Sequence, residues 1–212
     1  EDARIVAREL ERYYRDSRAS RKPVIDQRPL ADIVRDLGLA ELASRGGLAG
    51  ARLGRFVRDY LERTTRLHHP AYLAHQVAVP HPSGSLGSLV DGFTNNAMAI
   101  YEMGPAAAAI EYFVIDWLLG KVGWPAAPQA GGVLTHGGSL ANLTALIAAR
   151  SRLVPEVWEQ GNPGNLAILA PAASHYSVAR AAGILGLGRR ALYELETDER
   201  GVIRPDRLPQ AW

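Results

Sequence analysis

The feature that most constrains the fold is a glycine-rich turn between a short apolar strand and a helix-forming segment. The sequence predicts the strand over residues 133–135, the turn at Gly137-Gly138-Ser139 and the helix over residues 140–153. Glycines in such a turn let the backbone approach a ligand closely. The first helical turn also offers N–H groups without intrahelical partners and the positive end of the helix dipole, which together bind anions. The alternative is an ordinary strand-to-helix connection with Ser139 as the N-cap.

Strands and helices alternate through the rest of the C-terminal half of the chain. The remaining predicted elements are helices over residues 88–100, 105–119 and 175–185, and strands over residues 166–170 and 191–195. This alternation predicts an α/β fold with a mainly parallel sheet and helices on both faces. Ligands of such sheets bind at the carboxyl ends of the strands. We therefore expect the Gly138-Ser139 turn and the Ser174-His175 segment, which both follow a predicted strand, to meet in space.

The first part of the chain is rich in arginine and helical in pattern. Apolar residues recur at helical spacing over residues 5–14 and 56–61, and Pro23, Pro29 and Gly46-Gly47 separate the helices. The arginines alternate with acidic residues, which is typical of a solvated face. We predict a helical N-terminal segment over residues 1–80 and the N-terminal part of an α/β domain over residues 81–212.

Composition narrows the class of protein. The 212 residues are 47% hydrophobic and 22% charged, as in a soluble globular protein. A net charge of +2 is too small to indicate a nucleic-acid partner. No stretch approaches the ~18 uninterrupted apolar residues of a membrane span, so we expect no membrane association. The absence of cysteine excludes disulfides and fits a cytoplasmic protein.

Four histidines lie close together in the sequence and raise the question of a metal site. They are His68, His69, His75 and His81. Prolines interrupt this segment, and no cysteine or carboxylate lies among the histidines at ligand spacing. We therefore predict no metal.

Four blocks of sequence, in the same order, resemble the group II pyridoxal-phosphate-dependent decarboxylases. The blocks are H-P-A-Y-L-A-H-Q from His69, N-N-A-M-A-I-Y-E-M-G-P from Asn95, T-H-G-G-S-L-A-N-L from Thr135 and S-H-Y-S from Ser174. That family includes glutamate, aromatic amino acid, histidine and diaminobutyrate decarboxylases. The second block and Leu140 most resemble the diaminobutyrate and tyrosine decarboxylase-like branch. The resemblance covers about residues 67–188 and implies the large domain of a fold-type I enzyme with pyridoxal 5′-phosphate as its cofactor.

The resemblance also implies roles for individual residues. Gly138 and Ser139 would hold the cofactor phosphate, and His175 would stack on the pyridine ring and act in catalysis. His75 and Gln76 would lie in the substrate pocket. His136 stands where the family has serine, so it either points away from the phosphate or adds a cationic contact to it. For His175 the residues alone leave a second interpretation, an inert hydrogen-bonded histidine at a helix start.

The lysine that forms the Schiff base in this family has no counterpart here. Lys22 and Lys121 are the lysines of the sequence, and neither resembles the family's lysine, which follows a histidine far downstream. We therefore expect this chain to be inactive alone and to be the N-terminal portion of a larger decarboxylase that releases CO₂ from an L-amino acid. The expected partners are a second copy in a homodimer, across which the N-terminal helices pack, and a C-terminal segment on the same gene or another chain. The alternatives are another fold-type I enzyme, such as an aminotransferase, and a non-catalytic binding module.

Overall fold

The computed structural model describes residues 1–73, 75–125 and 128–208. The chain divides into two compact units, Glu1–Asn96 and Ala97–Trp212. In the part of the chain that is described, no helix is both long and apolar enough to cross a bilayer. The predicted boundary after residue 80 stays a prediction.

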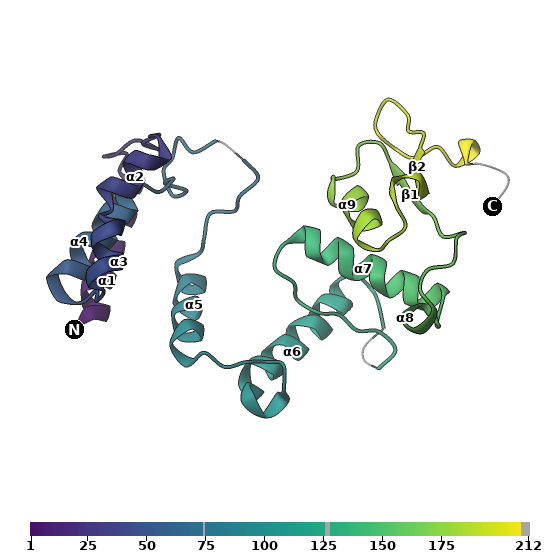
Figure 1. Cartoon of the computed structure of the whole chain (residues 1–212), viewed down its shortest axis with the longest axis horizontal. Helices are drawn as coiled ribbons and strands as arrows, with labels where there is room; N and C mark the ends of the chain where they lie inside the picture. The colour runs from purple at the N-terminus through teal and green to yellow at the C-terminus, as the bar shows by residue number, and fades with distance from the viewer. Residues whose placement is uncertain (74, 126–127, 209–212) are drawn as a thin grey trace. The chain divides into compact units, whose positions relative to one another are not determined.

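The first unit is helical, and two of its helices pack closely on each other. Its helices are α1 (Asp2–Arg18), α2 (Leu30–Asp36), α3 (Leu39–Arg45), α4 (Gly50–Glu62) and α5 (Pro82–Thr94). A Cβ added at Gly54 of α4 would lie 2.9 Å from Cγ2 of Ile5 in α1. Arg58 of α4 donates from Nη2 to Oε1 of Glu9 at 2.7 Å. Both apolar stretches predicted to be helical lie within α1 and α4, and Figure 1 shows α1 to α4 gathered together.

A buried arginine joins the end of α1 to the chain that follows α4. The Arg66 guanidinium donates to Ser17 Oγ and to Glu62 Oε2, each at 3.1 Å. It also lies over the ring of Tyr13, with 4.7 Å between its central carbon and the ring centroid. Because a buried charge is costly unless it is paired, these contacts fix where the chain leaves the helical cluster.

Helix α5 begins and ends earlier than the helix predicted over residues 88–100. His81 is its N-cap and accepts a hydrogen bond from the Ser83 N–H on its ring Nδ1, and Pro82 occupies the first helical position. Asn95 ends the helix in the left-handed conformation, with φ at +48°. Histidine is not a usual N-cap residue, so the start of this helix is only weakly marked in the sequence.

The second unit contains both strands of the described residues. Its elements are η1 (Tyr101–Met103), α6 (Pro105–Lys121), α7 (Gly138–Leu153), α8 (Val157–Gln160), β1 (Ile168–Pro171), α9 (Ser177–Ile184), η2 (Arg189–Ala191), β2 (Leu192–Leu195) and η3 (Pro205–Arg207). Strands β1 and β2 pair in parallel, with Ile168 opposite Leu192, and α9 lies in the connection between them. The predicted succession of strand, helix and parallel strand is confirmed here (Figure 1).

The strand predicted over residues 133–135 is wrong. The Leu134 N–H donates to Oε1 of Glu111, a residue of α6, at 2.9 Å. A Cβ added at the nearby Gly132 would lie 3.2 Å from Cγ2 of Ile115, also in α6. This segment therefore contacts α6. Its Leu134 N–H bonds to a side-chain oxygen of that helix instead of to the backbone of a neighbouring strand. Among the described residues, β1 and β2 form the sheet by pairing with each other.

Helices α7 and α9 pack on each other. The buried residues of α9 are Ser177, Ala181 and Ala182, and Leu185 beyond its last turn is buried as well. Three of these four side chains are small, which lets helix backbones approach closely. The side-chain hydroxyl of Ser177 is the polar group on this buried face, and a buried hydroxyl requires hydrogen-bond partners.

Candidate functional site

The glycine-rich turn forms the N-terminus of α7. Gly137 is the N-cap, with φ at +84° and ψ at 159°, a region of backbone conformation that is essentially restricted to glycine. Ser139 is the second residue of the helix, so the interpretation of Ser139 as the N-cap is wrong. The Ala141 N–H makes the first intrahelical bond, to the Gly137 carbonyl at 3.2 Å. The N–H groups of Gly138, Ser139 and Leu140 precede that bond.

The surroundings of this turn fit a phosphate group. A Cβ added at Gly137 or Gly138 would meet no atom within 4 Å, so the backbone there borders open space. Thr135 holds the turn in shape, because its carbonyl accepts from the Gly137 N–H at 3.0 Å and its hydroxyl donates to the Gly137 carbonyl at 3.3 Å. A phosphate carries the acceptor oxygens and the negative charge that helix N-termini bind. His136 is exposed at the same turn.

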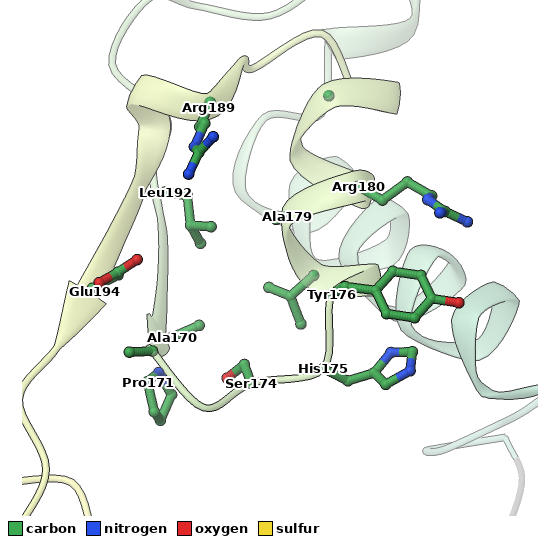
Figure 2. Close-up of a pocket in the computed structure, with 13 residues that line it drawn as sticks. Ala170, Pro171, Ser174, His175, Tyr176, Ala179, Arg180, Arg189, Leu192 and Glu194 are labelled. Carbon is green, nitrogen blue, oxygen red and sulfur yellow. The ribbon is translucent and has the colours of Figure 1, made fainter.

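His175 lies between the end of β1 and the start of α9. Its Nδ1 is 2.9 Å from Ser177 Oγ and 3.3 Å from the Ser177 backbone nitrogen. The imidazole contacts the Tyr176 ring, with centroids 4.1 Å apart and planes at 38°. Arg180 lies over the Tyr176 ring at 4.7 Å from its centroid. Figure 2 shows the side chains of His175 and Tyr176, at the start of α9, and of Arg180, within it, on the side away from β2.

Ser177 links His175 to the helix that begins at the glycine-rich turn, through one hydrogen bond to each. Asn142, in the first turns of α7, donates from Nδ2 to Ser177 Oγ at 2.8 Å. The contacts of Ser177 thus run from α7 to the imidazole. The helix that follows the glycine-rich turn therefore contacts the helix that follows His175. That the turn itself meets the Ser174-His175 segment stays a prediction, as do the roles of Gly138, Ser139 and His175 toward a cofactor.

The predicted substrate residues, His75 and Gln76, belong to the first unit and are exposed. His75 has φ at +59°, which is uncommon for a residue other than glycine. Such backbone strain accompanies many functional sites but does not identify one. Their place in a substrate pocket stays a prediction.

Neither lysine has the surroundings of a nucleophile. Lys22 pairs with Glu62, with 3.3 Å between Nζ and Oε2. Lys121 is the last residue of α6, and its ammonium lies 5.2 Å from the centroid of the Trp117 ring. Each ammonium group is thus engaged by another side chain.

A hollow of about 720 Å³ lies between α9 and the two strands. Ala170 of β1, Leu192 and Glu194 of β2, and Ala179 of α9 line it, and His175 borders it (Figure 2). Gly138 and Ser139 do not line this hollow. The glycine-rich turn and the hollow are therefore separate features. Across residues 1–73, 75–125 and 128–208, no three His, Cys, Asp or Glu residues are placed to hold a metal ion.

Sequence reasoning placed Gly137 in the turn without a role of its own, and it missed Asn142 and Ser177 as parts of the site. A Gly-Gly pair before a helix signals that one glycine takes a positive φ, but not which one. Ser177 follows His175 by two residues, a spacing at which short polar side chains contact nearby groups. Asn142 gave no signal, because its partner lies in another helix.

Comparisons with known proteins place these features in a family. The pyridoxal-dependent decarboxylase conserved domain matches residues 60–211. The acidic amino acid decarboxylase GADL1 of Mus musculus is 29% identical over 164 residues, which are 76% of this chain and 29% of that protein. The L-2,4-diaminobutyrate decarboxylase of Acinetobacter baumannii is 28% identical over 171 residues, 74% of this chain and 33% of that protein.

The crystal structure of mouse CSAD shares the fold, with a TM-score of 0.78 at 21% identity over 96% of this chain and 43% of that one. This likeness confirms the prediction of a fold-type I large domain preceded by helices. The chain spans about a third of the length of the curated relatives that it matches.

Proposed function

The chain belongs to the pyridoxal-dependent decarboxylase family, and from this we propose that it is the N-terminal, cofactor-binding part of an amino acid decarboxylase. Pyridoxal phosphate is the cofactor of this family. The observation that carries the proposal is the hydrogen bond that ties the α7 helix to the serine holding His175. An anion-binding helix N-terminus and an imidazole are thereby held in one rigid arrangement. A phosphorylated aromatic cofactor needs that pair of contacts.

Each residue of the proposed site has a separate task. The N–H groups of Gly138 and Ser139 bind the phosphate, and the conformation of Gly137 keeps both at the mouth of the turn. His175 covers one face of the cofactor ring and stands where a proton can be held on Nε2. When bound, the cofactor accepts the electron pair that remains when the amino acid loses CO₂. A lysine from further sequence or another chain would complete the site, because Lys22 and Lys121 are engaged elsewhere.

We also propose that the complete enzyme is a cytoplasmic homodimer, with the N-terminal helices at the subunit contact. The apolar side chains of α5, the helix that follows this N-terminal segment in the first unit, support a subunit contact. Leu86, Leu89, Val90 and Phe93 are all exposed, and Phe93 retains 90% of its accessible surface. Burial of four large side chains of this kind would stabilise a subunit interface by several kcal/mol, at ~1.5–3 kcal/mol each. The absence of cysteine agrees with a reducing compartment.

The proposed phosphate site is tested by two substitutions at the turn. Gly137→Ala forces a side chain into a backbone conformation that L-residues rarely adopt, and Gly138→Val fills the space that the phosphate would occupy. We expect each to weaken binding of pyridoxal phosphate to the full chain at least tenfold. The measurement is a fluorescence titration with the cofactor, repeated with inorganic phosphate as competitor.

Gly164→Val is the matched control, because Gly164 has a negative φ and an added Cβ there meets no atom within 4 Å. This variant should bind the cofactor as the parent chain does. If Gly137→Ala and Gly138→Val also bind like the parent chain, the turn does not hold the phosphate and the proposal fails.

A further inference from the structure

The hydrogen-bond donors around His175 meet at one ring nitrogen. Both the backbone N–H and the hydroxyl oxygen of Ser177 lie within hydrogen-bond distance of Nδ1, at 3.3 Å and 2.9 Å. A backbone N–H is always a donor, so Nδ1 must accept and therefore carries no proton. In the neutral imidazole the single N–H is then on Nε2.

Because Nδ1 accepts, the donor and acceptor in the two hydrogen bonds of the Ser177 hydroxyl can be assigned. Since Nδ1 is an acceptor, the Ser177 hydroxyl contacts it by donating its only proton. The hydroxyl oxygen then accepts from Nδ2 of Asn142 at 2.8 Å. The chain of donors runs from Asn142 through Ser177 to His175. The backbone N–H makes Nδ1 an acceptor whichever way the Asn142 amide is turned, whereas the donation from Asn142 to Ser177 rests on Nδ2 being the atom at the hydroxyl.

The burial of Ser177 keeps its hydroxyl bonded to these protein partners. Ser177 retains 2% of its accessible surface, so its hydroxyl cannot exchange a protein partner for bulk water. The imidazole is held on a second side by Tyr176, whose ring centroid lies 4.1 Å away. Arg180 in turn lies over that tyrosine. One edge and one face of the His175 ring are thus occupied by protein, while the residue as a whole remains exposed.

We propose that Asn142 and Ser177 are positioning residues that hold the His175 imidazole as the Nε2–H tautomer and tie its orientation to α7. The tautomer follows from the contacts in this chain. Its role toward the cofactor ring rests on the proposed function. We call the two hydrogen bonds, from Asn142 to Ser177 and from Ser177 to His175, the relay. In the proposed site, the relay would let the phosphate-binding helix set the plane of the stacking ring. It would also present Nε2–H, a donor, on the side away from Ser177.

The experiment reads the tautomer directly, in the full chain without cofactor. The chain is prepared with ¹⁵N-imidazole histidine, and long-range ¹H–¹⁵N spectra are recorded at about pH 8.5, about two units above the ordinary histidine pKa. The His175 signals are assigned by their loss in His175→Asn. We expect Nδ1 of His175 at the shift of an unprotonated nitrogen and Nε2 at that of a protonated one. A protonated Nδ1 in the parent chain would overturn the proposal without any variant.

Two substitutions then test the relay itself. Asn142→Asp replaces the donor by an acceptor, so the Ser177 hydroxyl turns toward the new carboxylate and no longer donates to Nδ1. Ser177→Ala removes the hydroxyl. Loss of one hydrogen bond should lower the ratio of the Nε2–H to the Nδ1–H tautomer about fivefold in each variant. Ser177→Thr keeps the hydroxyl and should restore the parent ratio.

Asn165→Asp is the matched control, because it makes the same chemical change at an exposed position of the same unit. It should leave the His175 signals unchanged. Equal spectra for Asn142→Asp and Asn165→Asp would show that the relay does not act on the imidazole. Because no cofactor is present, that outcome leaves the proposed phosphate site untouched, and the Gly137 and Gly138 variants test that site separately.

Discussion

Single polar side chains fix the geometry of both units where they are buried. In the second unit Asn162 donates to the carbonyl of Leu185, at 2.5 Å, and accepts from Arg150 at 3.3 Å, which closes the C-terminal end of α9. In the first unit Glu9 lies between Arg12 and Arg58. Asn162 is half-buried and Glu9 is buried, and each has hydrogen-bond partners there.

Glu9 makes the stability of the first unit depend on pH. The hydrogen bond from Arg58, with further attraction from Arg12, lowers the pKa of the Glu9 carboxyl in the folded chain, although burial opposes this shift. A lowered folded pKa adds stability above the unfolded value of about 4.3, and that stability is lost as the pH falls through the folded value. We expect Glu9→Gln to lower the free energy of unfolding by about 1 kcal/mol at pH 7, and to have no effect near pH 2.

The measurement is urea unfolding followed by circular dichroism at both pH values. Glu41→Gln is the matched control, since Glu41 pairs with Arg45 on the exposed surface of α3 and contributes little. An equal loss for Glu9→Gln at both pH values would mean that the carboxylate charge is not the source of the stability.

At the scale of elements, the contact between α1 and α4 depends on a glycine, which has no side chain to separate the two helices. Gly54 is buried in the middle of α4, and the helix pair leaves no room for a Cβ beside Ile5. Exposed glycines in helices normally cost stability relative to alanine, by about 1 kcal/mol. At Gly54 the close approach of two helices offsets that cost.

Gly54→Ala therefore should destabilise the chain although alanine is the better helix former. The 2.9 Å approach to Ile5 Cγ2 forces α1 and α4 apart, and overpacking of this kind costs about 1–3 kcal/mol. Thermal unfolding followed by circular dichroism measures the effect. Gly87→Ala in α5, where an added Cβ meets no atom within 4 Å, should instead stabilise the chain slightly. A melting temperature raised by both substitutions would contradict the packing described here.

Helices and strands could be predicted from sequence where their own residues carry the whole signal, such as apolar periodicity and a flanking glycine or proline. Helices α6, α7 and α9 and strands β1 and β2 lie within a few residues of their predicted positions, because apolar periodicity and flanking glycine or proline mark them. The strand over residues 133–135 could not be judged in the same way, since pairing depends on a neighbour. The same limit applies to the site. The turn and His175 were visible in the sequence, whereas the bond between Asn142 and Ser177 exists only once α7 and α9 pack.

At the scale of the whole molecule, the proposed cofactor site and the two lysines lead to a prediction about covalent binding. Lys22 is held by Glu62 and Lys121 by Trp117. Noncovalent contacts through phosphate and ring alone give weak binding. We therefore expect the chain, mixed with pyridoxal phosphate and reduced with borohydride, to carry no stoichiometric pyridoxyl group by mass spectrometry, and to release no CO₂ from amino acids.

Lys22→Arg and Lys121→Arg should leave noncovalent cofactor binding as it is in the parent chain. A stoichiometric adduct on either lysine, or measurable CO₂ release by the parent chain, would show that this chain is catalytically complete. That result would replace the proposal of an N-terminal part by one of a small, self-sufficient enzyme.

The bond between Asn142 and Ser177 spans 35 positions in the sequence. The parallel pairing of Ile168 with Leu192, which encloses α9, spans fewer still. Contacts of such short range close small loops, and small loops form quickly and early during folding. The segment that holds the imidazole can thus reach its final form early in folding, from contacts made within one short stretch of the chain.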